Sequence, residues 1–65
     1  MSFEVYETVK VLEDDFSTGI EKGDIGTIIM VYDTPNEAYE VEFIDEEGRV
    51  KYQGVYLLNQ ITKLK

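Results

Sequence analysis

Paired carboxylates are the first feature of this 65-residue sequence whose residue types could support chemistry. Glu40 and Glu42 lie two positions apart in the segment AYEVEFI. On an extended chain this spacing puts both carboxylates on one side, about 7 Å apart, within the range that glycosidases use. A chain of this length is too small to enclose a sugar in a cleft that excludes water. We therefore expect no catalytic residues and no enzyme.

Two acidic turns offer oxygen ligands of the kind that calcium and magnesium prefer: Asp14-Asp15 and Asp45-Glu46-Glu47. Neither has the spacing of an EF-hand. The sequence contains no His and no Cys, which removes the common ligand sets for zinc, iron and copper, and also Cys nucleophiles and Ser-His pairs. A glycine-rich phosphate loop is missing as well. We expect no metal and no cofactor.

The charge is strongly negative and unevenly placed. Fourteen acidic residues outnumber six basic ones, for a net charge of -8, and residues 13–47 carry twelve of the acids with Lys22 as their single basic residue. One interpretation is a solvated surface that keeps a small domain soluble. The other is a face that meets a basic protein, because clustered charge speeds association with an oppositely charged surface.

The same charge disfavours nucleic acid, because affinity for phosphates depends on Lys and Arg. Nucleic-acid binding is favoured only by the basic residues in the last third of the sequence, which would form one local basic edge: Arg49, Lys51, Lys63 and Lys65. The N-terminus has no signal-peptide pattern, and the longest apolar run, residues 28–32, is too short to span a bilayer. The expected location is the cytoplasm, without membrane contact.

These side chains must be positioned by strands, because the apolar residues alternate with a period of two. Strands are predicted over residues 7–12, 26–32, 38–44, 49–57 and 61–64, with a short helical turn within residues 57–61 before the last. Turn-forming residues separate them. Five short strands predict an all-β fold, a single domain over residues 1–65 whose sheet curls into a small barrel and so protects its edges.

The alternation also predicts which side chains lie inside. Tyr39 is expected in the core, on the same side of its strand as Val41 and Phe43. Residues 26–32 are apolar on both sides, so either the row with Met30 and Tyr32 or the row between them leaves the core. An exposed Met30 and Tyr32, joined by Tyr56, would form a patch of the kind that interfaces use. Gly54, inside the fourth strand, suggests a bulge or a bend.

Two segments, KGDIGTI (residues 22–28) and YEVEFIDEEG (residues 39–48), resemble a family of small uncharacterised bacterial proteins and, more distantly, the translation-associated KOW-type segment. The resemblance covers residues 8–64 and implies an SH3-like small barrel. Some members are similar to small proteins found beside toxins, which implies an immunity or antitoxin role. The segment KYQGVY (residues 51–56) departs from the family's more aliphatic fourth strand, which weakens the transfer of any shared binding surface.

The sequence therefore favours a non-enzymatic module that binds a basic protein, such as a toxin whose cationic site it masks. The alternatives are a structural or accessory subunit that self-associates through the Met and Tyr patch, and a KOW-like nucleic-acid or ribosome-associated module. The residues predicted to bind the partner supply charge at five positions and apolar contact at two: Glu40, Glu42, Asp45, Glu46, Glu47, Met30 and Tyr32.

Overall fold

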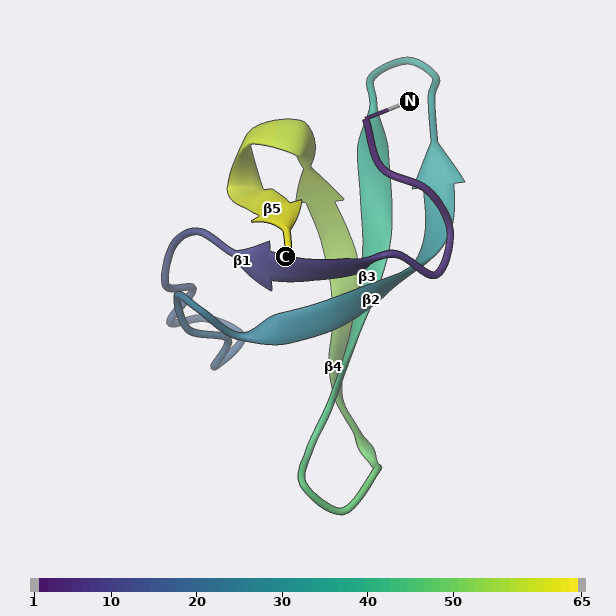
Figure 1. Ribbon diagram of the computed structural model, residues 1–65. Coiled ribbons are helices and arrows are strands. Elements are labelled where there is room, and N and C mark those ends of the chain that lie inside the picture. Colours follow the sequence, from purple (N-terminus) through teal and green to yellow (C-terminus); the bar gives the residue numbers. More distant parts are fainter. Residues whose placement is uncertain (1, 65) are drawn as a thin grey trace.

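A single antiparallel sheet of five strands makes up the computed structural model, which describes residues 2–64. The strands are β1 (Thr8–Val11), β2 (Ile25–Tyr32), β3 (Ala38–Ile44), β4 (Val50–Leu57) and β5 (Ile61–Lys63), and the 3-10 turn η1 (Leu58–Gln60) joins β4 to β5. Their order across the sheet is β4-β3-β2-β1-β5 (Figure 1). The predicted all-β class, the five strands and the helical turn before the last strand are confirmed.

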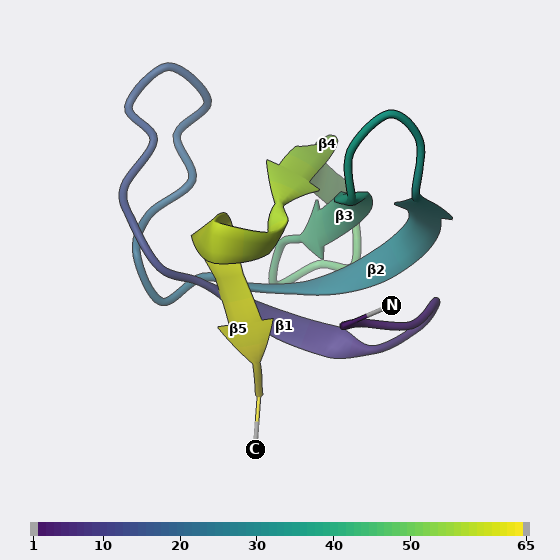
Figure 2. The same ribbon diagram turned by 90° about the horizontal axis from the view of Figure 1, so that it is seen from above.

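The sheet curls because β2 serves two partners along its length. Ile25 to Thr27 pair with β1, and the strand from Thr27 to Tyr32 pairs with β3. β1 and the first part of β2 consequently cross the direction of β3 and β4 (Figure 1), and η1 carries the chain from one outer strand to the other (Figure 2). One curled sheet can thus enclose a core in a chain too short for two stacked layers.

Among residues 2–64, ten apolar side chains form the core on the inner side of this curl. β3 contributes alternate residues, Tyr39, Val41 and Phe43, as the period of two predicts. Phe3 packs edge-on against Tyr39 from the segment before β1, with ring centroids 5.1 Å apart. The full set is Phe3, Val9, Val11, Ile20, Ile28, Tyr39, Val41, Phe43, Tyr56 and Ile61.

A β-bulge in β2 settles which of its two apolar rows faces the core. Ile28 pairs with Val41 and Met30 with Glu40, so that Ile29 is an extra residue with no partner position of its own. The bulge switches the alternation: Ile28 is buried before it, whereas Met30 and Tyr32 are exposed after it. Neither of the two rows, Ile28 with Met30 and Tyr32 or Ile29 with Val31, is therefore wholly inside. After the bulge, Val31 is the residue that packs against the core.

Two expectations about β4 are wrong. Gly54 pairs in register with Val41, so β4 has no bulge there, and the irregularity lies at Lys51, between Val50 and Tyr52, the partners of Ile44 and Phe43. A Cβ at Gly54 would lie 2.7 Å from Cζ of Tyr52, so a larger residue there would require the Tyr52 ring to shift. Tyr56 is not part of an exposed patch, since only 6% of its surface is accessible and its ring packs against Phe43.

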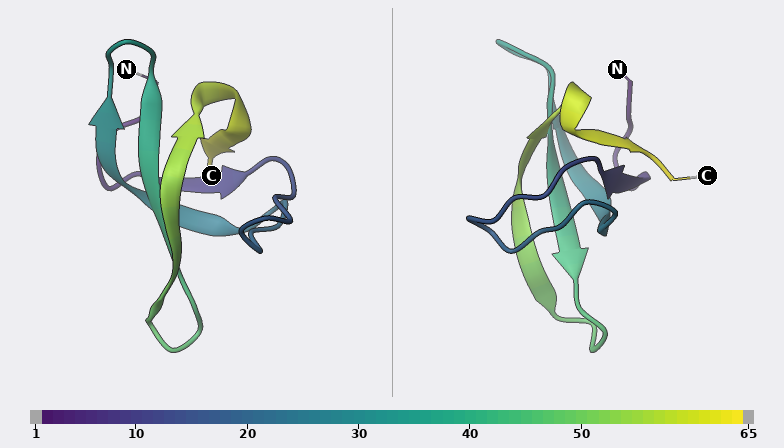
Figure 3. Two further views of the ribbon diagram at one scale, coloured as in Figure 1. Left: turned by 180° about the vertical axis from the view of Figure 1, so that it is seen from behind. Right: turned by 90° about the vertical axis from the view of Figure 1, so that its left-hand side faces the viewer.

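The turns lie at opposite ends of the molecule. The β2–β3 turn is at one end and the β3–β4 turn projects at the other, while the long β1–β2 loop, residues 12–24, extends to the side (Figure 3). Within residues 2–64 there is no helix with the length and apolar character to cross a membrane.

Candidate functional site

The outer surface of β2, β3 and β4 gathers four exposed apolar side chains and two carboxylates. Strand register puts Met30 and Val55 on either side of Glu40, and it puts Tyr32 and Leu57 on either side of Ala38. Glu42 follows two positions along β3, on the same side. We call this surface the Glu40 face, defined as Met30, Tyr32, Glu40, Glu42, Val55 and Leu57. Its four apolar members are all exposed, Met30 to 50% and Val55 to 56%.

Glu40 is held at the centre of this face by hydrogen bonds from both neighbouring strands. The Tyr32 hydroxyl donates to Oε1 at 2.9 Å, and Nε2 of Gln53 donates to Oε2 at 3.4 Å. The bond to the carboxylate raises the pKa of Tyr32, because it stabilises the protonated phenol. These two hydrogen bonds link side chains of three neighbouring strands through the Glu40 carboxylate.

The structure brings together four of the seven predicted partner-binding residues: Met30, Tyr32, Glu40 and Glu42. The other three lie in the β3–β4 turn beyond the ends of these strands. Oδ1 of Asp45 accepts hydrogen bonds from the backbone N–H groups of Glu47 and Arg49, at 2.8 and 2.9 Å. Asp45 therefore shapes the turn, whereas Glu46 is exposed and Glu47 pairs with Arg49 at 3.7 Å.

Val55 and Leu57 are members of the face that sequence reasoning missed. A signal was available, because Tyr52, Gly54 and Tyr56 alternate on the inner side of β4 and leave the positions between them outside. What the alternation could not give is their position beside Met30, Glu40 and Tyr32. That neighbourhood depends on the register of three strands and on the bulge at Ile29.

A small hollow forms a second feature, at the base of the β1–β2 loop. Its volume is about 110 Å³, and its lining combines three consecutive carboxylate residues with apolar and amide groups: Glu13, Asp14, Asp15, Val11, Tyr56 and Gln60. We call it the Tyr56 hollow. The Tyr56 hydroxyl is buried and has no hydrogen-bond partner among the described residues. Within residues 2–64 no group of three or more acidic side chains is arranged to hold a metal ion.

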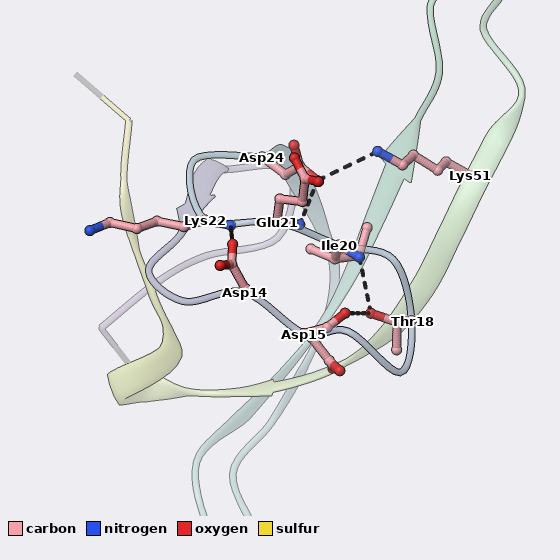
Figure 4. A network of polar contacts seen from close by, with 8 residues as sticks. All are labelled: Asp14, Asp15, Thr18, Ile20, Glu21, Lys22, Asp24 and Lys51. Atoms are coloured by element: carbon pink, nitrogen blue, oxygen red, sulfur yellow. Dashed lines mark hydrogen bonds and ion pairs between the residues drawn. The ribbon is translucent and has the colours of Figure 1, made fainter.

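Hydrogen bonds within the loop position the carboxylates of this hollow (Figure 4). Oδ1 of Asp14 accepts from the backbone N–H of Lys22 at 2.8 Å. Oδ1 of Asp15 accepts from both the N–H and the hydroxyl of Ser17, and these bonds lower the pKa of Asp15. Asp24 is engaged elsewhere, because it pairs with Lys51 at 3.5 Å. The loop is thereby closed on itself, and the lowered pKa keeps the Asp15 carboxylate ionised at neutral pH.

Replacing Tyr56 by phenylalanine is expected to stabilise the protein by about 1 kcal/mol. A buried hydroxyl without a partner keeps its desolvation cost, and phenylalanine removes that cost while preserving the ring. Urea unfolding at pH 7 measures the change. A variant less stable than the wild-type protein would mean that the hydroxyl is hydrogen-bonded after all.

The same pair of proteins should diverge further in alkali. Burial, with the negative charge of nearby groups, raises the pKa of Tyr56 from 10.0 to about 12. Between these values the unfolded chain loses the Tyr56 proton and the folded chain keeps it, so the stability of the wild-type protein falls as the pH rises. The Tyr56→Phe protein lacks this contribution. The difference in unfolding free energy between the two should widen from pH 10 to pH 12, and a constant difference would contradict the burial of this phenol.

Comparison with known protein families places the chain among proteins of undefined activity. Residues 5–52 match the family described as Domain of unknown function (DUF4926). Because the match covers well over half of the sequence, the chain belongs to this family. No curated protein and no solved structure matches it.

Proposed function

We propose that this protein is a non-enzymatic binding module that docks on a basic protein through the Glu40 face. The observation that carries the proposal is the composition of that face, where four exposed apolar side chains lie beside Glu40 and Ala38, and Glu42 follows along β3. Aromatic residues and Met are enriched at protein interfaces. No Lys or Arg among residues 2–64 forms an ion pair with either glutamate, so a partner's cations would meet uncompensated charge.

The acidic and the apolar side chains would contribute to binding in different ways. The net charge of -8 steers a basic partner toward the module and raises the association rate, an effect that salt weakens. Met30, Tyr32, Val55 and Leu57 supply the apolar area whose burial slows dissociation. The fixed Glu40 carboxylate sets the register of the contact. In its most specific form the partner is a toxin whose cationic site is masked, which the resemblance to small proteins found beside toxins supports.

Self-association through the same face is the weaker candidate. In a two-fold symmetric dimer each copy presents the same patch to the other, which would bring Glu40 and Glu42 of one copy close to those of its partner. Like charges in an interface are unfavourable. The same carboxylates would attract a cationic partner but repel a second copy of the protein.

The structure also weighs against the KOW-like alternative of nucleic-acid binding. The cations of the expected basic edge that the structure describes are each paired with a carboxylate. Arg49 pairs with Glu47, Lys51 with Asp24 and Lys63 with Glu7, and Lys65 lies outside the described residues. Cations already paired with carboxylates gain less from phosphate contacts.

Affinity capture with matched charge-reversal variants tests the proposal. We expect the tagged protein to retain a basic protein from its host at low salt and to release it at high salt. Glu42→Lys should reduce capture at least about tenfold, because like charges then meet in the interface. Glu21→Lys changes the net charge equally but lies in the exposed β1–β2 loop, and it should reduce capture less than about twofold.

Two results would contradict the proposal. Equal losses in the two variants would show that net charge, rather than the Glu40 face, retains the partner. Recovery of untagged copies of the protein alone, independent of salt, would instead support self-association.

A further inference from the structure

β4 is an outer strand whose outward backbone edge is unpaired. The order across the sheet ends at β4 on one side and at β5 on the other (Figure 1), and within residues 2–64 the curl does not bring these two strands into pairing. β4 has eight residues and β5 has three. Backbone groups that point away from a sheet can pair with a further strand, and β4 offers the longer row of them.

A side-chain hydrogen bond shows which backbone groups of β4 point outward. The N–H of Leu57 donates to Oε1 of Gln60 at 2.7 Å, so it points away from β3. Backbone direction alternates along a strand, and β4 is in regular register with β3 from Leu57 back to Gln53. The N–H and C=O groups of Val55 and Gln53 consequently point outward as well, and no described residue bonds to them on that side. We call these outward groups of Gln53 and Val55 the β4 edge.

The β4 edge lacks the features that normally prevent a strand from pairing with another chain. Proteins protect such edges with charged residues, proline, bulges or very short strands. Residues 52–57, YQGVYL, contain no charged residue and no proline. The irregularity of β4 lies before this segment, at Lys51, and the charge of Lys51 is paired with Asp24 at 3.5 Å. An unprotected edge of this kind points to a strand from another molecule.

The glutamates of the neighbouring strand indicate which molecule supplies that strand. The register puts Glu40 next to Val55. Glu42 is next to Gln53, and neither glutamate forms an ion pair with a Lys or Arg among residues 2–64. A strand added to β4 would lie about 10 Å from β3, two strand spacings away. Long basic side chains cross such a distance, with their apolar stems lying against Val55.

The spacing of the two glutamates matches that of an extended basic segment. Glu40 and Glu42 are two positions apart on a strand, and alternate residues of an added strand repeat at the same distance, about 7 Å, on the same side of the sheet. We propose that the basic partner pairs an extended segment with the β4 edge, with Lys or Arg at alternate positions directed toward Glu40 and Glu42. Backbone pairing supplies affinity in this mode, and the alternate side chains supply specificity. The inference rests on the proposed function and adds how the partner is held.

A second copy of the protein fits the same edge less well. The only charged residue in β4 is Lys51, which already pairs with Asp24. A β4 strand from another copy would therefore leave Glu40 and Glu42 without a cation. The glutamates of both copies would lie on one continuous sheet in an assembly with twice the net charge of -8, which repulsion opposes.

Amide hydrogen exchange followed by NMR tests the β4 edge in the protein alone. The N–H groups of Gln53 and Val55 should exchange at least about tenfold faster than those of Gly54 and Tyr56, which point toward β3. Equal protection of all four would contradict an open edge. Protection of Gln53 and Val55 that grows with protein concentration, together with a dimer in sedimentation, would assign the edge to a second copy and overturn the proposal.

The acetylated and amidated peptide VRVRVRV is the probe for the basic segment. At low salt it should produce saturable NMR shifts along β4 and slow the exchange of Gln53 and Val55. VVRRRVV has the same composition without the alternation and should bind about fivefold more weakly. VEVEVEV reverses the charge and should show no saturable binding.

Two changes separate backbone pairing from charge. Chemical synthesis of the chain with an ester in place of the Gly54–Val55 amide removes one outward N–H and keeps every side chain, which should weaken VRVRVRV about fivefold. An ester before Glu46, an exposed turn residue, is the matched control and should change the affinity less than about twofold. Glu42→Lys should weaken the peptide at least about fivefold. Glu4→Lys, an equal charge change at an exposed residue before β1, should weaken it less than about twofold.

The outcomes separate this proposal from the proposed function. If both arginine peptides bind equally and Glu42→Lys weakens them while the Gly54–Val55 ester does not, the Glu40 face attracts cations without strand pairing, and only the present proposal is overturned. If VRVRVRV pairs with β4 and Glu42→Lys has no effect, the glutamates do not meet the partner, and both proposals fail. Absence of saturable binding by VRVRVRV would refute pairing at the β4 edge, and the capture experiment would still decide on the Glu40 face.

Discussion

Replacing Gly26 by alanine is expected to lower the free energy of unfolding by about 2 kcal/mol, through overpacking of the core. Gly26 is a buried position in β2, where it pairs with Val9 of β1. A Cβ built there would lie 2.6 Å from Cγ1 of Val41 and 2.8 Å from Cε1 of Phe43. Neither neighbour can move aside easily, because both are almost completely buried.

Such a loss is large for this protein. Domains below about 70 residues rarely gain more than about 3–5 kcal/mol from a single core, so the Gly26→Ala protein should be partly unfolded near physiological temperature. Urea unfolding followed by circular dichroism measures the change. The preference of alanine over glycine in a strand reduces the cost slightly but does not reverse it.

A double-mutant cycle with Val41→Ala tests the cause. Val41→Ala alone destabilises by opening space in the core, but it also removes the methyl group that the new Cβ would meet. The two substitutions together should therefore cost at least about 1 kcal/mol less than the sum of the single costs. Additive costs would show that Gly26 is needed for some reason other than close packing.

Replacing Tyr39 by phenylalanine is expected to destabilise the protein by about 1–2 kcal/mol, the opposite sign to the same change at Tyr56. The hydroxyl of Tyr39 accepts a hydrogen bond from the backbone N–H of Phe3 at 3.3 Å and donates one to Glu37. Its removal leaves a buried N–H without an acceptor and a carboxylate without its donor. The two tyrosines thus form a matched pair, measured by the same unfolding experiment.

The pH dependence of the Tyr39→Phe effect has a definite sign. The hydrogen bond from Tyr39, aided by the backbone N–H of Ser2, lowers the pKa of Glu37 from 4.5. A lowered carboxyl pKa contributes stability above the unfolded value, and this contribution is lost as the pH falls through the folded value. The cost of Tyr39→Phe should therefore shrink below pH 4.5. In the variant, NMR titration should find the pKa of Glu37 closer to its ordinary value.

Local patterns in the sequence predict the strands well because each strand is half buried. In β3, Tyr39, Val41 and Phe43 are inside, as strict alternation requires. Of the proposed binding residues, Met30, Tyr32, Glu40 and Glu42 do share a face, because they are on adjacent strands. Asp45 does not, since a carboxylate at the start of a turn bonds to the turn's own backbone.

Contacts between distant segments were beyond sequence reasoning. Phe3 precedes the first strand, and its burial depends on docking against Tyr39, 36 positions later. The Tyr56 hollow likewise combines the acidic exit of β1 with the end of β4. Alternation within one strand carries no information about such pairings, which depend on how the sheet curls.

The bulge at Ile29 also bears on how this gene can change in length. Loss of one codon from an ordinary strand inverts the exposure of every residue beyond it. Here, Ile28 already pairs with Val41 and Met30 with the adjacent Glu40. A deletion of the Ile29 codon would leave each remaining residue of β2 on its present side of the sheet, with Val31 inside and Tyr32 outside. Length variation at this position of β2 is therefore compatible with an unchanged Glu40 face.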